Sequence, residues 1–561
     1  MYRIGLALLG IGIVVATAVV ADDEEAVQGL THAEAMALGE RMYRDGILPS
    51  GEAMRAFVQG DIEVDGSMFS CESCHLRSGM GSIEGTVITL PTCGTWLYKP
   101  LVGAEMNPVS QSRVPDRLDP PPFREAYTDR TVARAIWLGK DPNGRELSRV
   151  MPRYRMDTSD MDILVYYLKH LSAEWSPGVD DTTIRFATVV AGDVEPTRRA
   201  AMIDALQVHV RDHNSQVRHE ERRAKGAPFY KEEKYVPYRR YALDVWDLTG
   251  DPATWGAQLE DHYTEAPVFA LLGGISDGGW APVHEFSERR QLPCLFPITE
   301  LPVISESDWY TLYFSKGFYQ EGEAAAKFLR RAENLARNIP VVQVHRGTAD
   351  GRAFARGFRE MRATMDLTPP TDLELDAETV VDDAFWRRLV TDHAGAVLAL
   401  WLGPSDLGGL AQLAEAPRPP MVFVPGTLLG DDLAAIPDPV RDIVYVTHPE
   451  SFPEDETRSR LATTKWLEAR GLEVTDFDIQ AKMYFLGWSL AGMVKMMRDD
   501  FYRDYFLEKA DMMRDQYYAV AVYPRLSFGP GQRYASKGCY LAQVTPGEAP
   551  RLEKRSGWVI H

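Results

Sequence analysis

Positive charge and cysteine are both scarce in this chain of 561 residues. It has 61 Lys and Arg against 81 Asp and Glu, a formal net charge of -20. This balance excludes binding to nucleic acid or to an anionic membrane through bulk charge, so we expect no nucleic-acid partner. Five cysteines are present, and two belong to a motif described below. The remaining three, Cys93, Cys294 and Cys539, cannot form a complete disulfide framework. Either Cys294 pairs with Cys539, or all three are buried free thiols.

Long apolar runs are also nearly absent. The one clear run extends from Ile4 to Ala21, follows the single positive charge of Arg3, and ends in small residues before Asp22. This pattern is typical of an export signal, so we expect residues 1–21 to be cleaved and the mature protein to lie in the periplasm. The alternative is an uncleaved anchor helix, since about 18 apolar residues is near the lower limit for spanning.

Motifs of several enzyme classes are missing. There is no Gly-x-Ser-x-Gly, and the Gly-containing stretch 273–279 is not followed by the Gly-Lys-Ser/Thr of a phosphate loop. His209 and His213 stand four residues apart on a predicted helix, with His219 beyond them, either as ligands of zinc or copper or as part of a charged, solvated helix face. The surrounding charges favour the solvated face.

The most specific motif is Cys-x-x-Cys-His at residues 71–75. This is the attachment sequence of c-type haem: the thiols of Cys71 and Cys74 add to the haem vinyl groups, and His75 becomes the proximal ligand of the iron. Half a zinc site would need two more ligands nearby, and none appears. A thioredoxin-like redox pair would not need the histidine. We therefore predict one covalently bound haem c.

The flanking residues extend this motif to a domain. Helices are predicted over 32–45, 129–138 and 158–171, the first ended by Gly46 and the second by Gly139, with a Pro-rich irregular loop over 91–122. Together with the haem motif and the Met-Pro at residues 151–152, residues 33–172 resemble a class I cytochrome c domain. The resemblance implies an all-α domain, placed here at 22–174, whose first and last helices cross where Gly39 makes room for Tyr167.

The same resemblance implies the ligands of the iron. The family's sixth ligand is the methionine before the last helix, which is Met151 here, while Met80, Met106 and Met156 are its rivals. It also implies that the carbonyl of Pro91 accepts the N–H of His75. With His75 and Met151 both bound, no open position would remain for oxygen or peroxide, which indicates an electron carrier rather than an enzyme.

The remainder of the chain alternates strand-like and helix-like segments after a short polar linker at 175–182. Residues 183–545 predict parallel sheets with helical crossovers, in two lobes, and 546–561 a C-terminal tail. Segments 254–259, 268–274, 280–282, 292–297, 309–315 and 523–530 make this region resemble type I periplasmic solute-binding proteins of the branched-chain amino acid receptor kind.

In open α/β folds the ligand lies beyond the carboxyl ends of the strands. Ser276 and Asp277 follow one predicted strand, and Tyr313 and Ser315 end another. Ser276 is expected to bond a carboxylate and Asp277 an ammonium group, with the other two facing the same cleft. The alternative is ordinary turn chemistry.

Two functions remain open on these grounds. The first is an exported monohaem cytochrome that passes electrons to a periplasmic redox partner, such as a dehydrogenase, with the second domain docking that partner or binding a small ligand. The second is a periplasmic amino acid or amide receptor of an ABC-type transport or sensing system. It would need a membrane transporter, and the haem would report redox state.

Overall fold

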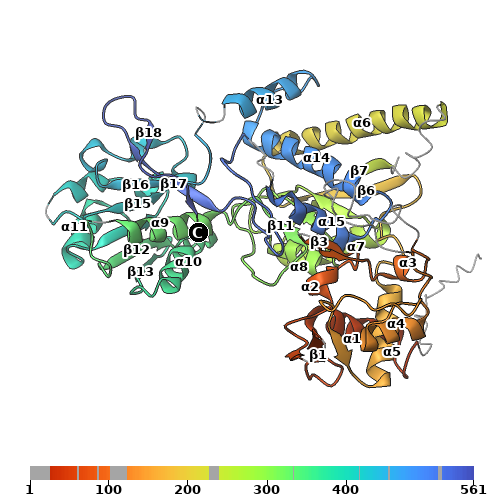
Figure 1. The fold of residues 1–561 in the computed structure, drawn as a ribbon. Helices are drawn as coiled ribbons and strands as arrows, with labels where there is room; N and C mark the ends of the chain where they lie inside the picture. Colours follow the sequence, from red (N-terminus) through yellow and green to blue (C-terminus); the bar gives the residue numbers. More distant parts are fainter. Residues whose placement is uncertain are drawn as a thin grey trace, which may run out of the picture. The chain divides into compact units, whose positions relative to one another are not determined.

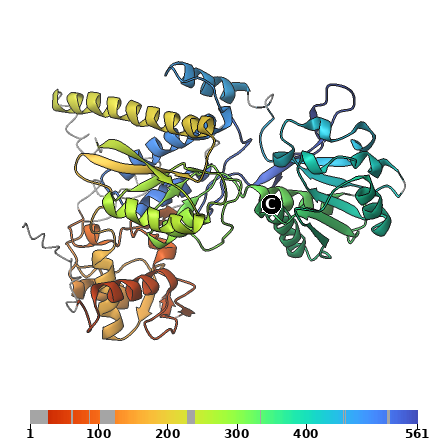
Figure 2. The ribbon, with the colours of Figure 1, turned by 180° about the vertical axis from the view of Figure 1, so that it is seen from behind.

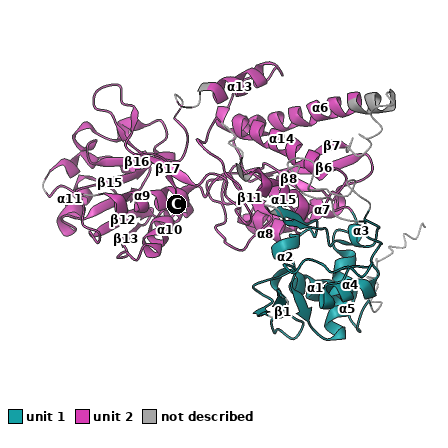
Figure 3. Cartoon of the chain, in the orientation of Figure 1, with its two compact units in different colours: residues 1–174 teal, residues 175–561 magenta. Residues whose placement is uncertain are grey.

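The structure is a computed structural model that describes residues 26–59, 62–84, 87–101, 123–226, 239–332, 334–415, 417–452, 455, 457–515 and 521–560. The expected signal segment, Met106 and most of the Pro-rich loop lie outside these residues. No helix in the described part of the chain has the length and apolar character needed to cross a membrane. The chain divides into two compact units, 1–174 and 175–561 (Figure 3).

Unit 1 combines helices with short strands. Its elements are α1 His32–Asp45, β1 Arg55–Val58, β2 Ile62–Asp65, α2 Glu72–His75, β3 Ser82–Glu84, β4 Val87–Thr89, α3 Gly94–Leu97, α4 Asp129–Leu138, β5 Arg153–Arg155 and α5 Thr158–His170. The strands form an antiparallel sheet of order β2-β1-β5 and a β3-β4 pair. The expectation of an all-α domain is therefore wrong. The strands are three or four residues long, and β5 pairs with β1 across about 100 residues of sequence, so no local pattern announces them.

The two outer helices of unit 1 cross as expected. Thr31 caps α1 with a capping box and Gly46 ends it in the left-handed region. A Cβ on Gly39 would stand 2.3 Å from the Cβ of Tyr167 on α5, so only glycine allows the helices to approach this closely. Tyr43 packs against Tyr167 at 5.5 Å between ring centroids. The crossing predicted from Gly39 and Tyr167 is confirmed.

The first lobe of unit 2 is a parallel sheet of order β11-β10-β8-β6-β7, with β9 paired to β6 (Figures 1 and 2). Its elements are β6 Thr183–Ala191, α6 Pro196–Gly226, β7 Arg240–Leu248, α7 Trp255–Glu265, β8 Ala270–Leu272, β9 Ile275–Ser276, α8 Ala281–Arg289, β10 Cys294–Leu295, β11 Thr311–Leu312, α14 Phe477–Met497 and α15 Arg503–Asp511. The helices alternate with strands because each parallel connection needs a crossover.

The second lobe is a sheet of order β13-β12-β14-β15-β16-β17-β18, parallel up to β16 and antiparallel beyond it. Its elements are α9 Phe318–Arg331, β12 Val341–Arg346, α10 Ala349–Thr364, β13 Thr371–Leu375, α11 Asp383–Asp392, β14 Val397–Trp401, β15 Val422–Pro425, α12 Gly426–Leu429, β16 Val444–His448, β17 Gly538–Val544, β18 Leu552–Lys554 and β19 Val559–Ile560. Helix α13, Thr457–Glu468, follows β16.

Strand β14 shows why this second sheet is covered on both faces. Val397, Ala399 and Trp401 belong to the core shared with α9 and α10, whereas Leu398 and Leu400 belong to the core shared with α11. A strand buried on both faces reads as a continuous apolar run, and successive side chains point to opposite sides. The expected two-lobed α/β architecture follows from this strand order.

Both flanking segments of unit 2 belong to its fold. In the expected linker, the Trp175 indole donates to the carbonyl of Asp499, and the Ser176 N–H donates to that of Phe501. The expected C-terminal tail contributes β18 and β19, which both pair with β17. The expected linker and the expected tail are therefore both part of the fold of unit 2, because their backbone or side-chain groups form hydrogen bonds with it.

The chain passes between the lobes of unit 2 after β11, after β16 and before β17. The first and third passages lie side by side: Tyr313 N–H donates to Arg533 O at 2.8 Å, and Ser536 N–H to Phe314 O at 2.6 Å. These paired segments connect the two lobes of unit 2.

Candidate functional site

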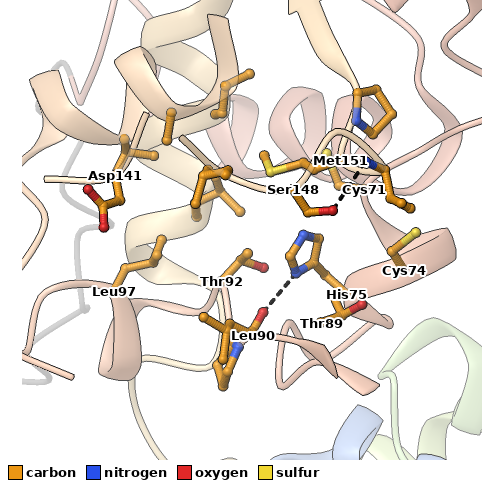
Figure 4. A pocket seen from close by; sticks show the side chains of 18 of the residues that line it. Cys71, Cys74, His75, Thr89, Leu90, Thr92, Leu97, Asp141, Ser148 and Met151 are labelled. Atoms are coloured by element: carbon orange, nitrogen blue, oxygen red, sulfur yellow. Dashed lines mark hydrogen bonds between the residues drawn. The ribbon is translucent and has the colours of Figure 1, made fainter. Parts of the chain in front are cut away.

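A cavity of about 380 Å³ in unit 1 gathers the residues of the haem motif (Figure 4). Cys71 and Cys74 lie at one side of it beside His75, because α2 is a single turn that brings the motif to one wall. Both thiols are free. Burial, followed by the neighbouring Cys74, raises the pKa of the Cys71 thiol to about 12.

The imidazole of His75 is held by a backbone carbonyl. Its Nδ1 lies 2.9 Å from Leu90 O, and because a carbonyl only accepts, Nδ1 carries the proton and Nε2 keeps its lone pair. Burial lowers the pKa of His75 to about 4, so the ring is neutral at pH 7. The expected acceptor was the carbonyl of Pro91, and this expectation is wrong by one residue, since the acceptor is the carbonyl of Leu90. Which carbonyl of the extended segment after β4 reaches the ring depends on the local backbone direction.

Met151 lies across the cavity from the Leu90 side of His75 (Figure 4). Its backbone is fixed by Arg153, whose Nη1 donates to Met151 O at 2.5 Å. Two rivals are placed elsewhere: Met80 is fully buried with its sulfur 3.6 Å from the thiol of Cys93, and Met156 does not line the cavity. Of the described methionines, Met151 is the one that lines it.

The walls suit a large flat apolar group with a polar edge. The apolar lining comes from Val87, Ile88, Leu90, Leu97, Leu101, Val132, Ala135, Ile136, Leu147, Val150 and Leu168. Two lining atoms, Thr92 Oγ1 and Trp96 Nε1, are buried and have no hydrogen-bond partner among the described residues. Buried polar groups are nearly always paired, so these two atoms fit the polar periphery of a bound molecule.

The residues present therefore fit a covalent haem. Cys71 and Cys74 would hold the group covalently, and the Nε2 lone pair of His75 and the soft thioether of Met151 would be ligands for its iron. A haem held in this way supplies a one-electron change of oxidation state at the iron. The protein fixes the orientation of His75 and excludes water with its apolar walls.

The four residues expected to bind a solute are engaged locally. Ser276 Oγ accepts from Gly278 N–H at 3.1 Å, and Asp277 Oδ2 from Asp193 N–H at 2.7 Å. Ser315 Oγ accepts from Gly317 N–H at 3.1 Å. The contacts of Ser276 and Ser315 are turn bonds of the kind left open above, whereas the contact of Asp277 joins two loops that are 84 residues apart in sequence.

Tyr313 lies inside the first lobe. It is 1% exposed, its hydroxyl lies 2.9 Å from His284 Nδ1, and its ring stacks on Tyr534. For these four residues, binding of a solute stays a prediction.

A different set of charged residues meets in unit 2 where the chain passes between the lobes. Lys482 of α14 lies with its Nζ 3.8 Å from Glu450 Oε1, just after β16, and 5.3 Å from the ring centroid of Tyr523. Glu300 follows β10 and is close enough to Lys482 for that ammonium to oppose the rise of its pKa. Burial raises the pKa of Glu450 to about 7, against the opposing effect of Lys482.

Glu321 on α9 adds a carboxylate to this charged cluster. The side chain is fully buried. Its Oε2 accepts from Gly426 N–H at 2.9 Å and from Thr447 Oγ1 at 2.5 Å, whereas Oε1 has no partner among the described residues. Burial raises the pKa of Glu321 to about 7. Hydrogen bonds from Thr427 and Thr447 oppose this rise in pKa, and the nearby Glu300 adds to it. No sequence pattern marks these residues, because they come from four distant segments of an acidic chain.

The histidines of α6 do not form a metal site. His209 stacks on Trp466 at 4.6 Å and His213 on Tyr241 at 3.5 Å, so two of the three histidines pack against aromatic rings instead of pointing to solvent. Within the described residues no group of three His, Cys, Asp or Glu is arranged to hold a metal ion. Cys294 on β10 and Cys539 on β17 are buried free thiols in separate sheets.

Comparisons with known proteins gave matches among solved structures. No family model matches the chain, and no curated protein matches it in sequence. A branched-chain amino acid ABC transporter protein from Thermus thermophilus with bound valine matches with a TM-score of 0.47 and 12% identity, over 68% of this chain and 97% of that one. A solute-binding protein from R. palustris in complex with benzoate matches with a TM-score of 0.42 and 13% identity, over 67% and 96%.

A leucine-binding protein from Thermotoga maritima is also similar, with a TM-score of 0.42 and 11% identity over 67% of this chain and 99% of that chain. The share of this chain in each match is close to the size of unit 2. The two-lobed α/β architecture itself rests on the strand order described above.

Proposed function

We propose that unit 1 is a c-type cytochrome domain that carries one covalent haem and transfers electrons. The observation that carries the proposal is the convergence on one apolar cavity of two free thiols, a histidine with a free Nε2 and the thioether of Met151. Two axial side chains would leave the iron no open position for a substrate, and methionine ligation raises its potential. Electrons would then pass through the haem edge to an exported redox partner.

The test is made on the full chain, produced with its export segment in a host that attaches haem c. We expect pigment that stays with the polypeptide in acid acetone and an oxidised spectrum with a methionine-to-iron charge-transfer band. Met151→Ala should abolish that band. Met156→Ala is the matched control, because Met156 does not line the cavity, and it should keep the band. A pigment that washes away removes the proposal.

We propose for unit 2 that it binds a small solute where its lobes meet, in the manner of a receptor for transport or sensing. The supporting observation is the charged cluster of Glu300, Glu321, Glu450 and Lys482, of which Glu300 follows β10 of the first lobe and Glu450 follows β16 of the second. Open α/β sheets bind ligands beyond the carboxyl ends of their strands. The similar structures are named for valine, benzoate and leucine.

The two proposals meet in one measurement. Redox titration of the full chain with and without a bound solute asks whether unit 2 changes the potential of the haem in unit 1. A shift in potential would favour a receptor in which the haem responds to solute binding in unit 2. The export segment would place this receptor in the periplasm. An unchanged potential with solute bound would separate the two functions.

A further inference from the structure

A second cavity, of about 270 Å³, lies in the first lobe of unit 2. Its lining comes from α6, α14, strands β7 and β8, and the end of α13 with the residues after it. Helices α6 and α14 lie side by side there (Figures 1 and 2). No residue of the charged cluster and no strand of the second lobe lines this cavity, so it is separate from the place where the lobes meet. Trp488 lines it and is 52% exposed, so the cavity reaches the surface.

The ring of His209 is fixed in the wall of this cavity by packing. On one side it stacks on Trp466, with 4.6 Å between ring centroids. A Cβ on Gly487 would stand 2.2 Å from the imidazole Cγ, so only glycine lets α14 approach the ring this closely. The indole of Trp488 and the ring of Tyr484 extend the aromatic lining. These walls present several aromatic faces and edges to one space.

Two polar groups of the lining residues have no partner. The Nε2 of His209 and the hydroxyl of Tyr241 are both buried and make no hydrogen bond with any described residue. Tyr241 is only 5% exposed, and its ring is stacked on His213 at 3.5 Å between centroids. Buried polar groups are nearly always paired. A molecule in the cavity that carries a hydrogen-bonding group would therefore satisfy both atoms.

The charges around the cavity are already paired. Asp212 Oδ2 accepts from Arg470 Nε at 2.6 Å, and the guanidinium of Arg470 also lies 4.9 Å from the ring centroid of Trp466. Burial lowers the pKa of His209 to about 4 and also lowers that of His213, so both imidazoles are neutral at pH 7. A charged molecule would find no free counter-charge on these residues, and charges are costly to bury unpaired. The lining therefore suits an uncharged molecule.

The size and the donors of the cavity narrow the class further. An apolar cavity of about 150 Å³ is enough to bind benzene in another protein, and this one is larger. A neutral imidazole nitrogen and a tyrosine hydroxyl can each donate or accept a hydrogen bond, as can a phenolic hydroxyl.

We propose that this cavity binds a small uncharged aromatic molecule with a hydroxyl group, a phenol. Its ring lies against the aromatic and apolar walls, and its hydroxyl bonds to His209 and Tyr241. This site is additional to the solute site proposed where the lobes meet, and it does not depend on that site.

The test is isothermal titration of the full chain at pH 7 with phenol, toluene and benzoate. Toluene has nearly the shape of phenol without the hydroxyl, and benzoate adds a negative charge. We expect phenol and toluene to bind. His209→Phe and Tyr241→Phe each keep a ring and remove one polar group, so each should weaken phenol binding by roughly 2- to 10-fold relative to toluene binding, the usual effect of losing one hydrogen bond.

Two controls accompany the variants. His219→Phe changes an exposed residue of α6 that does not line the cavity, and it should leave the ratio of phenol to toluene affinity as in the parent. Tyr241→Phe should not lower the melting temperature in the absence of ligand, because the hydroxyl that it removes has no partner among the described residues. A lowered melting temperature would count against the proposal, since it would show that this hydroxyl is already bonded.

Three other results would overturn the proposal. An affinity ratio that both Phe variants leave unchanged would remove His209 and Tyr241 from the site. Benzoate binding that either variant weakens would contradict the uncharged class. Absence of binding by phenol and toluene, with a folded protein shown by its melting transition, would exclude the cavity as an aromatic site.

Discussion

Glu321 offers a prediction whose size follows from its surroundings. The carboxyl is fully buried, and its pKa rises from an ordinary value near 4.5 to about 7, first because of burial and then because of Glu300. Each pKa step of one corresponds to about 1.4 kcal/mol, so keeping this group ionised costs the folded state about 3 kcal/mol. The Glu321→Gln variant removes the charge and keeps an oxygen that accepts from Gly426 and Thr447.

The sign of the effect depends on pH. Below pH 4.5 the carboxyl is protonated in the folded and the unfolded chain, so Glu and Gln should be nearly equivalent. As pH rises from 4.5 through 7, the unfolded chain ionises more readily than the folded one, and the parent loses stability. Above pH 7 the Gln variant should therefore be more stable, by up to about 3 kcal/mol.

Chemical denaturation of the full chain at pH 4.5 and pH 8, followed at the transition of unit 2, measures this difference. Glu285→Gln serves as the control, and we expect its free energy of unfolding to follow the parent at both pH values. A Glu321→Gln variant whose difference from the parent is the same at the two pH values would refute the reasoning, because it would mean that Glu321 ionises normally in the folded state.

Three further predictions follow from close contacts. Gly39→Ala forces a Cβ to within 2.3 Å of Tyr167 and should destabilise unit 1 by about 2 kcal/mol, lowering its melting temperature by roughly 5–10 °C, whereas Gly492→Ala on α14 meets open space and should not destabilise unit 2. Arg503→Ala removes a buried guanidinium that donates to the carbonyls of Val268 and Phe269, so denaturant unfolding of unit 2 should show a loss of about 3 kcal/mol. The double replacement of the two motif thiols, C71A with C74A, should release all pigment into acid acetone, while either single variant should retain it through one thioether.

Local signals in the sequence were sufficient for the parts of unit 1 that depend on neighbouring residues. Short stretches of sequence predict the capped helix α1, the helix α4 between Thr128 and Gly139, and the haem motif. Helix caps and motif chemistry depend on residues only three or four positions apart. The last helix, α5, is capped by Asp157, one residue before the expected start. The crossing of the outer helices was implied by the resemblance to cytochrome c domains, in which a glycine such as Gly39 makes room for an aromatic ring such as that of Tyr167.

Choices between chemically equal groups needed the tertiary structure. The sequence alone could not decide between Leu90 and Pro91 as the acceptor for His75, because adjacent carbonyls differ only in direction. The β strands of unit 1 could not be predicted for a related reason. Strand β5 pairs with β1, which is far away in the sequence, and a strand of three residues is too short to show an alternating apolar pattern.

By itself, the sequence determined the haem motif, the capped helices and the alternation of strands and helices, since each rests on interactions between near neighbours or on a repeated apolar pattern. Only the tertiary structure decided that Lys482 lies beside Glu450, and that the hydroxyl of Tyr313 is buried against His284. The physical reason is distance along the chain. Burial and charge pairing bring together four segments spread over almost 200 residues. The contacts between these segments are long-range, so the sequence of any one segment does not predict them.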